Sequence, residues 1–122
     1  MVSKKWRVAE LAFEQQLEIL NLTKSFPREE LYSLTTQVRR SSRSVCANLS
    51  EAYRKKRYPQ HFVLKLTDAL AENSETETWI EIALSCEYLA MTDVDILRDK
   101  NNQIGKLLSY MLSNTNDFLH NP

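Results

Sequence analysis

Apolar residues recur at alternating steps of three and four along most of the chain. The clearest example is the C-terminal seam Val94, Leu97, Asn101, Ile104, Leu108, Met111, Thr115 and Phe118. This spacing turns one stripe of a helix toward neighbouring helices. The pattern therefore predicts a helix at about residues 93–119 that packs within a helical bundle.

Turn signals divide the rest of the chain. Pro27 and Pro59 each suit the first turn of a helix, where the missing amide hydrogen has no partner to lose, and Thr92 or Asp93 is a candidate N-cap. Because short connections between long helices favour antiparallel neighbours, we expect an all-α fold, an antiparallel up-down-up-down four-helix bundle in one domain, 1–122. The predicted helices are at about residues 4–25, 28–57, 59–89 and 93–119.

The first three helices have seams of different character. The first offers Trp6, Phe13, Leu17 and Leu20, with Leu11, Ile19 and Leu22 widening the stripe. The second is small and polar in its second half: Leu31, Leu34, Val38, Ser41, Val45, Asn48 and Ala52. The third has the seam Phe62, Leu66, Ala69, Asn73, Thr76, Ile80 and Ala83, with an arc widened by Trp79, Ile82 and Cys86. This arc is either deep core or the contact surface of a homo-oligomer, because monomers rarely expose large apolar patches.

Composition agrees with a helical protein. The 122 residues are 43% hydrophobic and include a single glycine, Gly105, so few tight turns of the kind sheets need can form. No apolar window approaches the length of a membrane span, and the N-terminus lacks the apolar core of a signal peptide. Cys46 and Cys86 lie far apart in sequence, which favours two buried thiols over a disulfide or a metal site. We expect a cytoplasmic protein without membrane contact.

Charge is unevenly distributed although the chain is formally neutral. Residues 28–57 carry eight basic and three acidic side chains, and residues 58–89 carry one basic and six acidic ones. Antiparallel packing of these two segments would place Arg40 and Arg43 against Glu77 or Glu81. Such surface pairs contribute about 0–1 kcal/mol each, so they would select the register of the helices more than hold the fold.

The basic strip is also a candidate binding surface. Its members are Arg39, Arg40, Arg43, Arg54, Lys55, Lys56, Arg57 and Tyr58. At about 100° per residue, the arginines cannot all face one neighbour, and the "RKKRY" end lies among aromatic residues. Basic residues interleaved with aromatics contact phosphates and stack on bases. Because the pI is about 6.7, binding of RNA, DNA or a nucleic-acid-handling protein would be local or depend on several copies in an assembly.

Two asparagines occupy predicted seam positions. A buried amide without a partner costs about 1–3 kcal/mol, so Asn48 and Asn73 are expected to bond to each other, to Ser41 or Thr76, or across an interface. Polar groups in such seams commonly fix the register of packed helices. We interpret both asparagines as parts of a polar core rather than as ligand contacts.

Known catalytic patterns are missing from the sequence. A single glycine excludes phosphate-binding loops and dinucleotide fingerprints. His61 and His120 cannot supply the paired Glu-x-x-His motifs of a di-iron bundle. The cluster of Glu72, Glu75 and Glu77 is more typical of a salt-bridged face than of acid/base catalysis. We therefore expect no catalytic residue, no metal and no cofactor.

The stretch "FPREELYSLTTQVRRSSRSVCANLSEAY" resembles the bacterial four helix bundle protein family, also called the S23 or ribosomal-RNA intervening-sequence protein family. The similarity continues to about Leu89 and covers most of the chain. Many relatives have proline in place of Cys46 and glycine in place of Ala52, so the second helix should run straighter here. The residues that carry the resemblance are Phe26, Pro27, Glu30, Leu34, Gln37, Arg39, Arg40, Ser44, Ala47, Asn48 and Glu51.

The resemblance implies a bacterial, cytoplasmic homopentamer with no established catalytic residue and an essentially unknown function. A related architecture, the accessory protein of diversity-generating retroelements, binds a reverse transcriptase and nucleic acid, but this is an analogy of fold. Our main hypothesis is a non-enzymatic oligomeric adaptor that presents the basic strip to nucleic acid or a nucleic-acid-handling protein. The competing hypothesis is a structural or protein-interaction bundle whose strip pairs with the acidic third helix.

Overall fold

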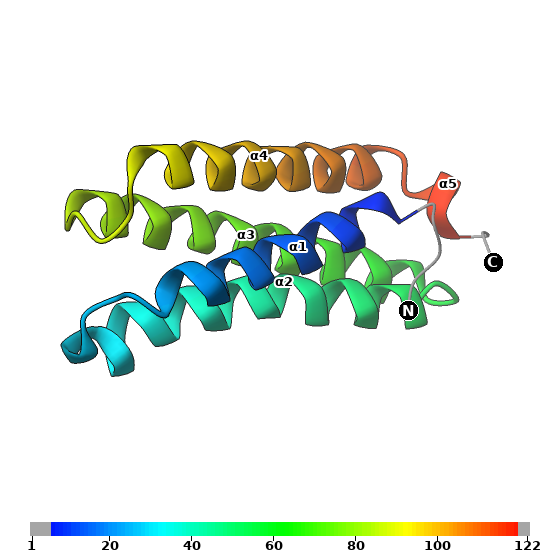
Figure 1. Cartoon of the computed structure of the whole chain (residues 1–122). Coiled ribbons are helices and arrows are strands. Elements are labelled where there is room, and N and C mark those ends of the chain that lie inside the picture. The colour runs from blue at the N-terminus through cyan, green and yellow to red at the C-terminus, as the bar shows by residue number, and fades with distance from the viewer. Residues whose placement is uncertain (1–5, 120–122) are drawn as a thin grey trace.

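Four long helices lie side by side along the molecule (Figure 1). The computed structural model describes residues 6–119, and no strand occurs within that range. The helices are α1 (Arg7–Thr23), α2 (Thr36–Arg54), α3 (Pro59–Ser85), α4 (Met91–Ser113) and the short α5 (Asn116–Leu119). Both α1 and α3 pack against α2 and against α4. The predicted all-α fold is confirmed.

The connection from α1 to α2 differs from the expected continuous helix over residues 28–57. Pro27 has extended backbone, with φ −55° and ψ 141°, so it precedes the helical region instead of beginning it. A 3₁₀ turn at Arg28–Glu30 is followed by a π-helical turn at Leu31–Thr35. A π turn inserts one extra residue into a helix and changes which side chains face the core.

Glu30 holds this irregular turn in place. Its carboxylate accepts hydrogen bonds from the Ser33 hydroxyl at 2.5 Å, the Leu34 amide at 3.4 Å and the Tyr88 hydroxyl at 2.9 Å. The Ser33 and Tyr88 bonds lower the pKa of Glu30 below its ordinary value. Leu31, a predicted seam residue, is 39% exposed, because the extra residue turns it away from the core.

The C-terminus of α3 has a Schellman cap. The helix ends at Ser85 and not near residue 89, and Glu87 adopts a left-handed backbone with φ 63°. The Tyr88 amide then donates to the Ala83 carbonyl at 2.9 Å, which is the bond expected of this motif. Glycine usually occupies the left-handed position, so a glutamate there gives the sequence no clear stop signal.

The last predicted helix also has different ends. Ala90, with extended ψ of 149°, is the N-cap of α4 and makes no side-chain cap. Thr92 and Asp93 lie inside the helix, so the prediction that either one caps it is wrong. A break at Asn114 separates α4 from α5, where one helix had been expected over residues 93–119.

The seams predicted for α3 and α4 are confirmed. All seven seam residues of α3 are buried: Phe62, Leu66, Ala69, Asn73, Thr76, Ile80 and Ala83. Six of the eight residues of the last predicted seam are buried in α4: Val94, Leu97, Asn101, Ile104, Leu108 and Met111. Thr115 and Phe118 lie beyond α4 and are half-buried. Each helix thus presents one continuous stripe to its neighbours.

The seam predicted for α1 is wrong at Phe13 and Leu17, whereas Leu11 and Ile19, which widen the predicted stripe, are buried. Trp6, which precedes the helix, is fully buried, but Phe13 and Leu17 are 44% and 41% exposed. The face of α1 that enters the core contains a polar residue, Gln15. Its members are Val8, Leu11, Ala12, Gln15, Ile19 and Thr23.

Gln15 enters the core because two asparagines bind it there. The Asn73 side-chain oxygen accepts from Gln15 Nε2 at 3.3 Å and from Asn101 Nδ2 at 3.1 Å, and Asn101 Nδ2 also lies 3.0 Å from Gln15 Oε1. Asn73 Nδ2 donates to the Asn101 carbonyl at 3.0 Å. Asn73 is therefore a buried, hydrogen-bonded residue as expected, but its partners are not Ser41 or Thr76, which bond to each other at 2.8 Å.

The cysteines are more exposed than expected, and the wide arc of α3 is only partly buried. Cys46 is half-buried, and burial raises the pKa of its thiol to about 11. Cys86 is exposed, so the prediction of two buried thiols is wrong for that residue. Trp79 packs against the core, whereas Ile82 is 38% exposed. The outer part of the arc thus remains on the surface of the chain.

Residues 6–119 contain neither a membrane-spanning helix nor a cluster of potential metal ligands. None of the helices combines the length and the apolar character needed to cross a membrane. No cluster of three or more His, Cys, Asp or Glu side chains in this range could hold a metal ion. His120 lies outside the described residues.

Candidate nucleic-acid interface

One side of α2 carries basic side chains separated by small ones. At about 100° per residue, positions 39, 43, 47, 50 and 54 fall on one face of a helix, and that face points away from the buried residues of α2. The 19 residues of α2 extend over about 28 Å at about 1.5 Å per residue. We call this face the outer stripe of α2, defined as Arg39, Arg43, Ala47, Ser50 and Arg54.

A groove of about 580 Å³ lies along the first half of the outer stripe. Arg43 and Ala47 are exposed in it, and Arg39 is half-buried. Because Ala47 and Ser50 are short, an extended polymer could approach the helix closely between the arginines. The groove is lined by Thr36, Arg39, Arg40, Arg43, Ser44 and Ala47.

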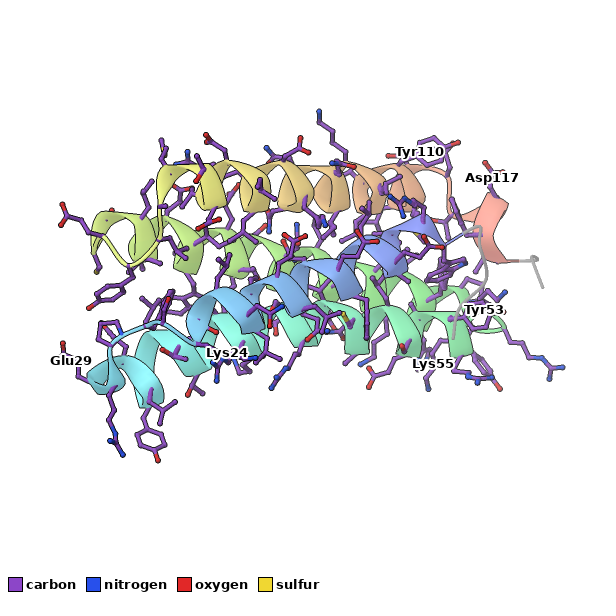
Figure 2. The ribbon with its side chains drawn as sticks, in the orientation of Figure 1. Lys24, Glu29, Tyr53, Lys55, Tyr110 and Asp117 are labelled. Carbon is purple, nitrogen blue, oxygen red and sulfur yellow. The ribbon has the colours of Figure 1, made fainter. Side chains whose placement is uncertain are left out.

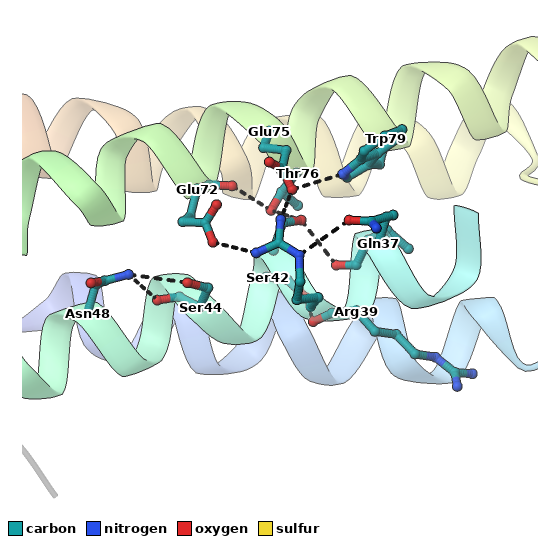
Figure 3. Close-up of polar contacts among 12 residues, drawn as sticks. Gln37, Arg39, Ser42, Ser44, Asn48, Glu72, Glu75, Thr76 and Trp79 are labelled. Atoms are coloured by element: carbon teal, nitrogen blue, oxygen red, sulfur yellow. Dashed lines mark hydrogen bonds and ion pairs between the residues drawn. The ribbon is translucent and has the colours of Figure 1, made fainter. Parts of the chain in front are cut away.

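Arg39 is anchored to α1. Its Nε donates to the Thr23 hydroxyl oxygen at 2.8 Å, and that hydroxyl donates to the Ile19 carbonyl at 2.7 Å. Figure 3 shows the Arg39 side chain extending away from the polar groups between α2 and α3. Its guanidinium therefore belongs to the outer stripe and not to the α2–α3 interface.

Arg40, in contrast, faces α3. Its guanidinium donates to Glu72 at 2.8 Å and to Glu75, and its Nε lies 3.3 Å from the Gln37 side-chain oxygen (Figure 3). Glu75 also accepts a hydrogen bond from Trp79 Nε1 at 3.2 Å. Arg40 is thus neutralised by the acidic helix, as the competing hypothesis required for the whole strip.

The partners predicted for the arginines are wrong. Arg40 binds carboxylates closer to the start of α3 than Glu77 and Glu81, and Glu81 instead pairs with Arg98 of α4 at 2.6 Å. Arg43 is exposed and makes no salt bridge within residues 6–119. The reason is rotational, because three residues turn the helix by about 300° and so move Arg43 onto the outer stripe.

The contacts between α2 and α3 shift the pKa of Glu72. Burial alone would raise the pKa, but the Ser44 hydroxyl and the Arg40 guanidinium lower it, and the net pKa lies below the ordinary value of 4.5. A carboxyl with a lowered pKa in the folded state adds stability that is fully present above 4.5 and is lost as the pH falls through the folded pKa.

Arg40→Ala should therefore weaken the acid dependence of stability. We expect the free energy of unfolding near neutral pH to fall by about 0.2–1 kcal/mol, because the pair is partly exposed, and the loss between about pH 5 and pH 3 to become smaller than in the wild type. Urea unfolding across this pH range measures both effects. Arg43→Ala is the matched control, and an equal effect of that substitution would contradict the assignment.

The residues of the basic turn after α2 lie in different environments. The Lys56 ammonium lies 4.3 Å from the centre of the Tyr53 ring, a cation–π contact within the protein. Arg54, Arg57 and Tyr58 are exposed, and Lys55 is half-buried. Lys55 lies near the opposite end of the molecule from Glu29 (Figure 2). This turn extends the positive charge of the outer stripe at its C-terminal end.

Tyr58 lies next to another aromatic side chain. The residue is 57% exposed, and its ring stands edge-on to His61, with the ring centres 6.0 Å apart. Exposed rings beside basic residues are the arrangement on which bases can stack. Tyr58 therefore remains a candidate contact at the end of the stripe.

Asn48 does not lie in the seam of α2. It is half-buried, and its amide donates to the Ser44 carbonyl at 2.9 Å and to the Ser44 hydroxyl at 3.2 Å. Leu49 is buried in its place. The prediction that Asn48 forms part of the polar core is wrong, because the seam advances by four residues from Val45 instead of by three.

Sequence reasoning missed two further cations near the outer stripe. Lys24 follows the end of α1 and Arg28 lies in the 3₁₀ turn, and both line a pocket together with Arg39. They come from separate segments with no shared motif. Their proximity follows only from the way the α1–α2 connection folds.

Comparisons with known proteins agree with this architecture. A solved crystal structure of a protein of unknown function from the S23 ribosomal protein family of Bacteroides thetaiotaomicron is similar, with a TM-score of 0.78 and 30% sequence identity over 86% of this chain and 97% of that chain. No curated protein matches. The family model described as 23S rRNA-intervening sequence protein matches residues 4–110. That family is of unknown function and is not known as an enzyme family. The resemblance is thereby confirmed, and the chain belongs to the 23S rRNA-intervening sequence protein family.

Proposed function

We propose that this protein is a non-enzymatic homo-oligomeric adaptor of the bacterial cytoplasm that binds nucleic acid through the outer stripe of α2. The observation that carries the proposal is the separation of the arginines by the fold. Arg40 faces carboxylates, whereas Arg39 and Arg43 face outward and make no salt bridge within residues 6–119. An adaptor of this kind joins nucleic acid to another component without catalysing a reaction.

The charge along the stripe supports this proposal. Glu51 is the single acidic residue between positions 36 and 57, and its carboxylate lies 2.6 Å from the Lys65 ammonium of α3. Local acid therefore does little to offset the stripe. Phosphate neutralisation by Lys and Arg supplies most of the affinity of non-specific nucleic-acid binding.

We further propose an up-down-up-down four-helix bundle as the subunit of the oligomer. The short connections at residues 55–58 and 86–90 support this topology. Phe13 and Leu17 on α1, and Ile82 on α3, are exposed apolar side chains that a second copy could cover. The family resemblance implies a pentamer, in which five stripes would bind one polymer far more tightly than one stripe could.

The test compares binding of a single-stranded RNA of about 30 nucleotides by gel shift at several salt concentrations. We expect binding by the wild type near 50 mM salt and a loss of at least tenfold in affinity for Arg43→Glu plus Arg54→Glu. The slope of log affinity against log salt should also become shallower by about 0.7 for each lost phosphate contact. Duplex DNA of the same length serves as the comparison ligand.

A control variant tests whether the loss of RNA binding is specific to the outer stripe of α2. Arg7→Glu plus Lys106→Glu changes the net charge equally but lies on α1 and α4, so RNA binding should be reduced much less. The mass from light scattering should be five times the 14.3 kDa of one chain. Absence of RNA binding by the wild type at low salt, or equal losses in the two double variants, would sink the nucleic-acid proposal.

The second candidate function is a protein-interaction bundle. The contacts of Arg40 with Glu72 and Glu75 favour it, because they pair part of the basic strip with the acidic helix α3. It predicts an oligomer of the same mass whose outer stripe has no affinity for RNA or DNA at any salt concentration.

A further inference from the structure

We infer that the corner where α1 meets α2 is a binding site for a single phosphate group. A pocket of about 230 Å³ opens there, and its wall includes three cationic side chains, Lys24, Arg28 and Arg39. They come from the end of α1, the 3₁₀ turn and α2. The site goes beyond the proposed function, because a small phosphate could bind it without any polymer on the outer stripe.

The three cations have no carboxylate partner within residues 6–119. Glu30, the carboxylate closest in sequence to Arg28 apart from Glu29, is engaged elsewhere with Ser33 and Tyr88. Glu29 lies at the tip of the molecule, beyond Lys24 (Figure 2). The charge facing the pocket is therefore positive.

Thr35, one of the residues that line this pocket, has a buried hydroxyl without a hydrogen-bond partner. Thr35 is 3% exposed, and its hydroxyl oxygen makes no hydrogen bond to the described part of the chain. In an α-helix this hydroxyl could donate to the carbonyl four residues back, which belongs to Leu31. In the π turn the Thr36 hydroxyl takes that carbonyl instead.

An unpaired buried hydroxyl lowers the stability of the fold unless a ligand forms a hydrogen bond with it. Leaving such a group without a hydrogen bond costs about as much as one or two ordinary hydrogen bonds contribute. Since π turns are rare and often mark functional sites, the orphaned Thr35 hydroxyl and the surrounding cations point to the same occupant. That occupant must be an anion with several acceptor oxygens.

Arg39 is oriented for such an anion. The bond from its Nε to Thr23 Oγ1, at 2.8 Å, fixes the side chain against α1. Its two terminal nitrogens make no hydrogen bond within residues 6–119. A guanidinium held this way can donate two parallel bonds to phosphate oxygens, and the Thr35 hydroxyl, Lys24 and Arg28 supply further donors.

The volume sets the size of the ligand. At about 30 Å³ per water molecule, 230 Å³ exceeds the space that a small oxyanion needs. The pocket can therefore hold a phosphate and part of the group attached to it. Inorganic phosphate, a mononucleotide and the terminal phosphate of a nucleic acid share this chemistry.

Calorimetric titration of the full chain with inorganic phosphate, at ionic strength held constant with sodium chloride, tests the site. We expect saturable binding by the wild type, about tenfold weaker binding by Thr35→Val, and loss of binding by Arg39→Ala. Thr35→Val should also melt at the same or a higher temperature without phosphate, because it removes an unpaired buried hydroxyl while keeping the shape of the side chain. Arg43→Ala should retain the affinity within about twofold.

Further arms identify the source of the phosphate. A 5′-mononucleotide is compared with its nucleoside, and a 5′-phosphorylated RNA with the same RNA ending in a hydroxyl. Tighter binding of the phosphorylated member of either pair supports the site if Thr35→Val abolishes the difference. The pair that shows this difference identifies the ligand. Arg43→Glu plus Arg54→Glu should keep phosphate binding while losing RNA, so the two proposals can fail separately. Absence of saturable phosphate binding by the wild type, or unchanged affinity in both Thr35→Val and Arg39→Ala, overturns the inference.

Discussion

Replacing Asn101 with leucine is expected to lower the free energy of unfolding by about 2–4 kcal/mol. Asn101 Nδ2 donates to three acceptors: the Gln15 side-chain oxygen at 3.0 Å, the Asn73 carbonyl at 3.0 Å and the Asn73 side-chain oxygen at 3.1 Å. Leucine leaves acceptors of two buried residues without this donor, and each unsatisfied buried group costs about 1–3 kcal/mol. Urea unfolding followed by circular dichroism measures the loss.

Two further variants show whether the loss of stability comes from unpaired polar groups or from a general disturbance of α4. Asn102→Leu changes the exposed neighbour and should alter stability by less than about 0.5 kcal/mol. Leucine at positions 15, 73 and 101 together should recover most of the loss, since replacing all members of a buried polar network can be nearly neutral. A triple variant that is less stable than Asn101→Leu would show that shape, and not hydrogen bonding, dominates this layer.

The same polar layer explains which seams the sequence could predict. In α3 and α4 the heptad places Asn73 and Asn101 between apolar residues, so the seam is recognised in spite of its polar members. In α1 the buried stripe has Gln15 at its centre, while exposed Phe13 and Leu17 form a more apolar stripe on the outside. Hydrophobic spacing alone selects the wrong face when a core position is polar and its partners belong to other helices.

The start of α2 could not be predicted for a similar reason. The π turn at Leu31–Thr35 depends on Glu30, whose carboxylate accepts from Ser33 nearby and from Tyr88 far along the chain. Local propensity favours one continuous helix there. Only the tertiary contact with Tyr88 shows why the chain departs from it.

The candidate interface was predictable in composition but not in arrangement. The sequence indicates a basic strip next to an acidic helix, and Arg40 does face that helix. Which of the remaining arginines turn outward depends on the rotation of α2 about its axis, and this is fixed by buried Val45 and Leu49. Lys24 and Arg28 join Arg39 only through the folded connection, so no linear motif could reveal them.

The basic turn after α2 depends on a small aromatic cluster in the core. Phe62 is fully buried, and its ring stands edge-on to Trp6 with centres 5.9 Å apart. Trp6 in turn meets Tyr53 at 5.4 Å, and Tyr53 holds the Lys56 ammonium over its ring. The position of the turn is therefore coupled to the packing of the start of α3.

Phe62→Ala is expected to lower the free energy of unfolding by about 3–5 kcal/mol, because it removes a large side chain from a closed core and leaves a cavity. Leu64→Ala, two residues along α3 at a position that is 55% exposed, should change stability by less than about 0.5 kcal/mol. Amide hydrogen exchange at residues 55–58 should also become faster in the Phe62 variant than in the Leu64 variant, since Trp6, which packs against Tyr53, loses its contact with Phe62. Equal exchange in both variants would mean that the turn is held by its own backbone, through bonds such as Tyr58 N–H to the Lys55 carbonyl at 2.8 Å, and that the aromatic cluster does not position the basic residues.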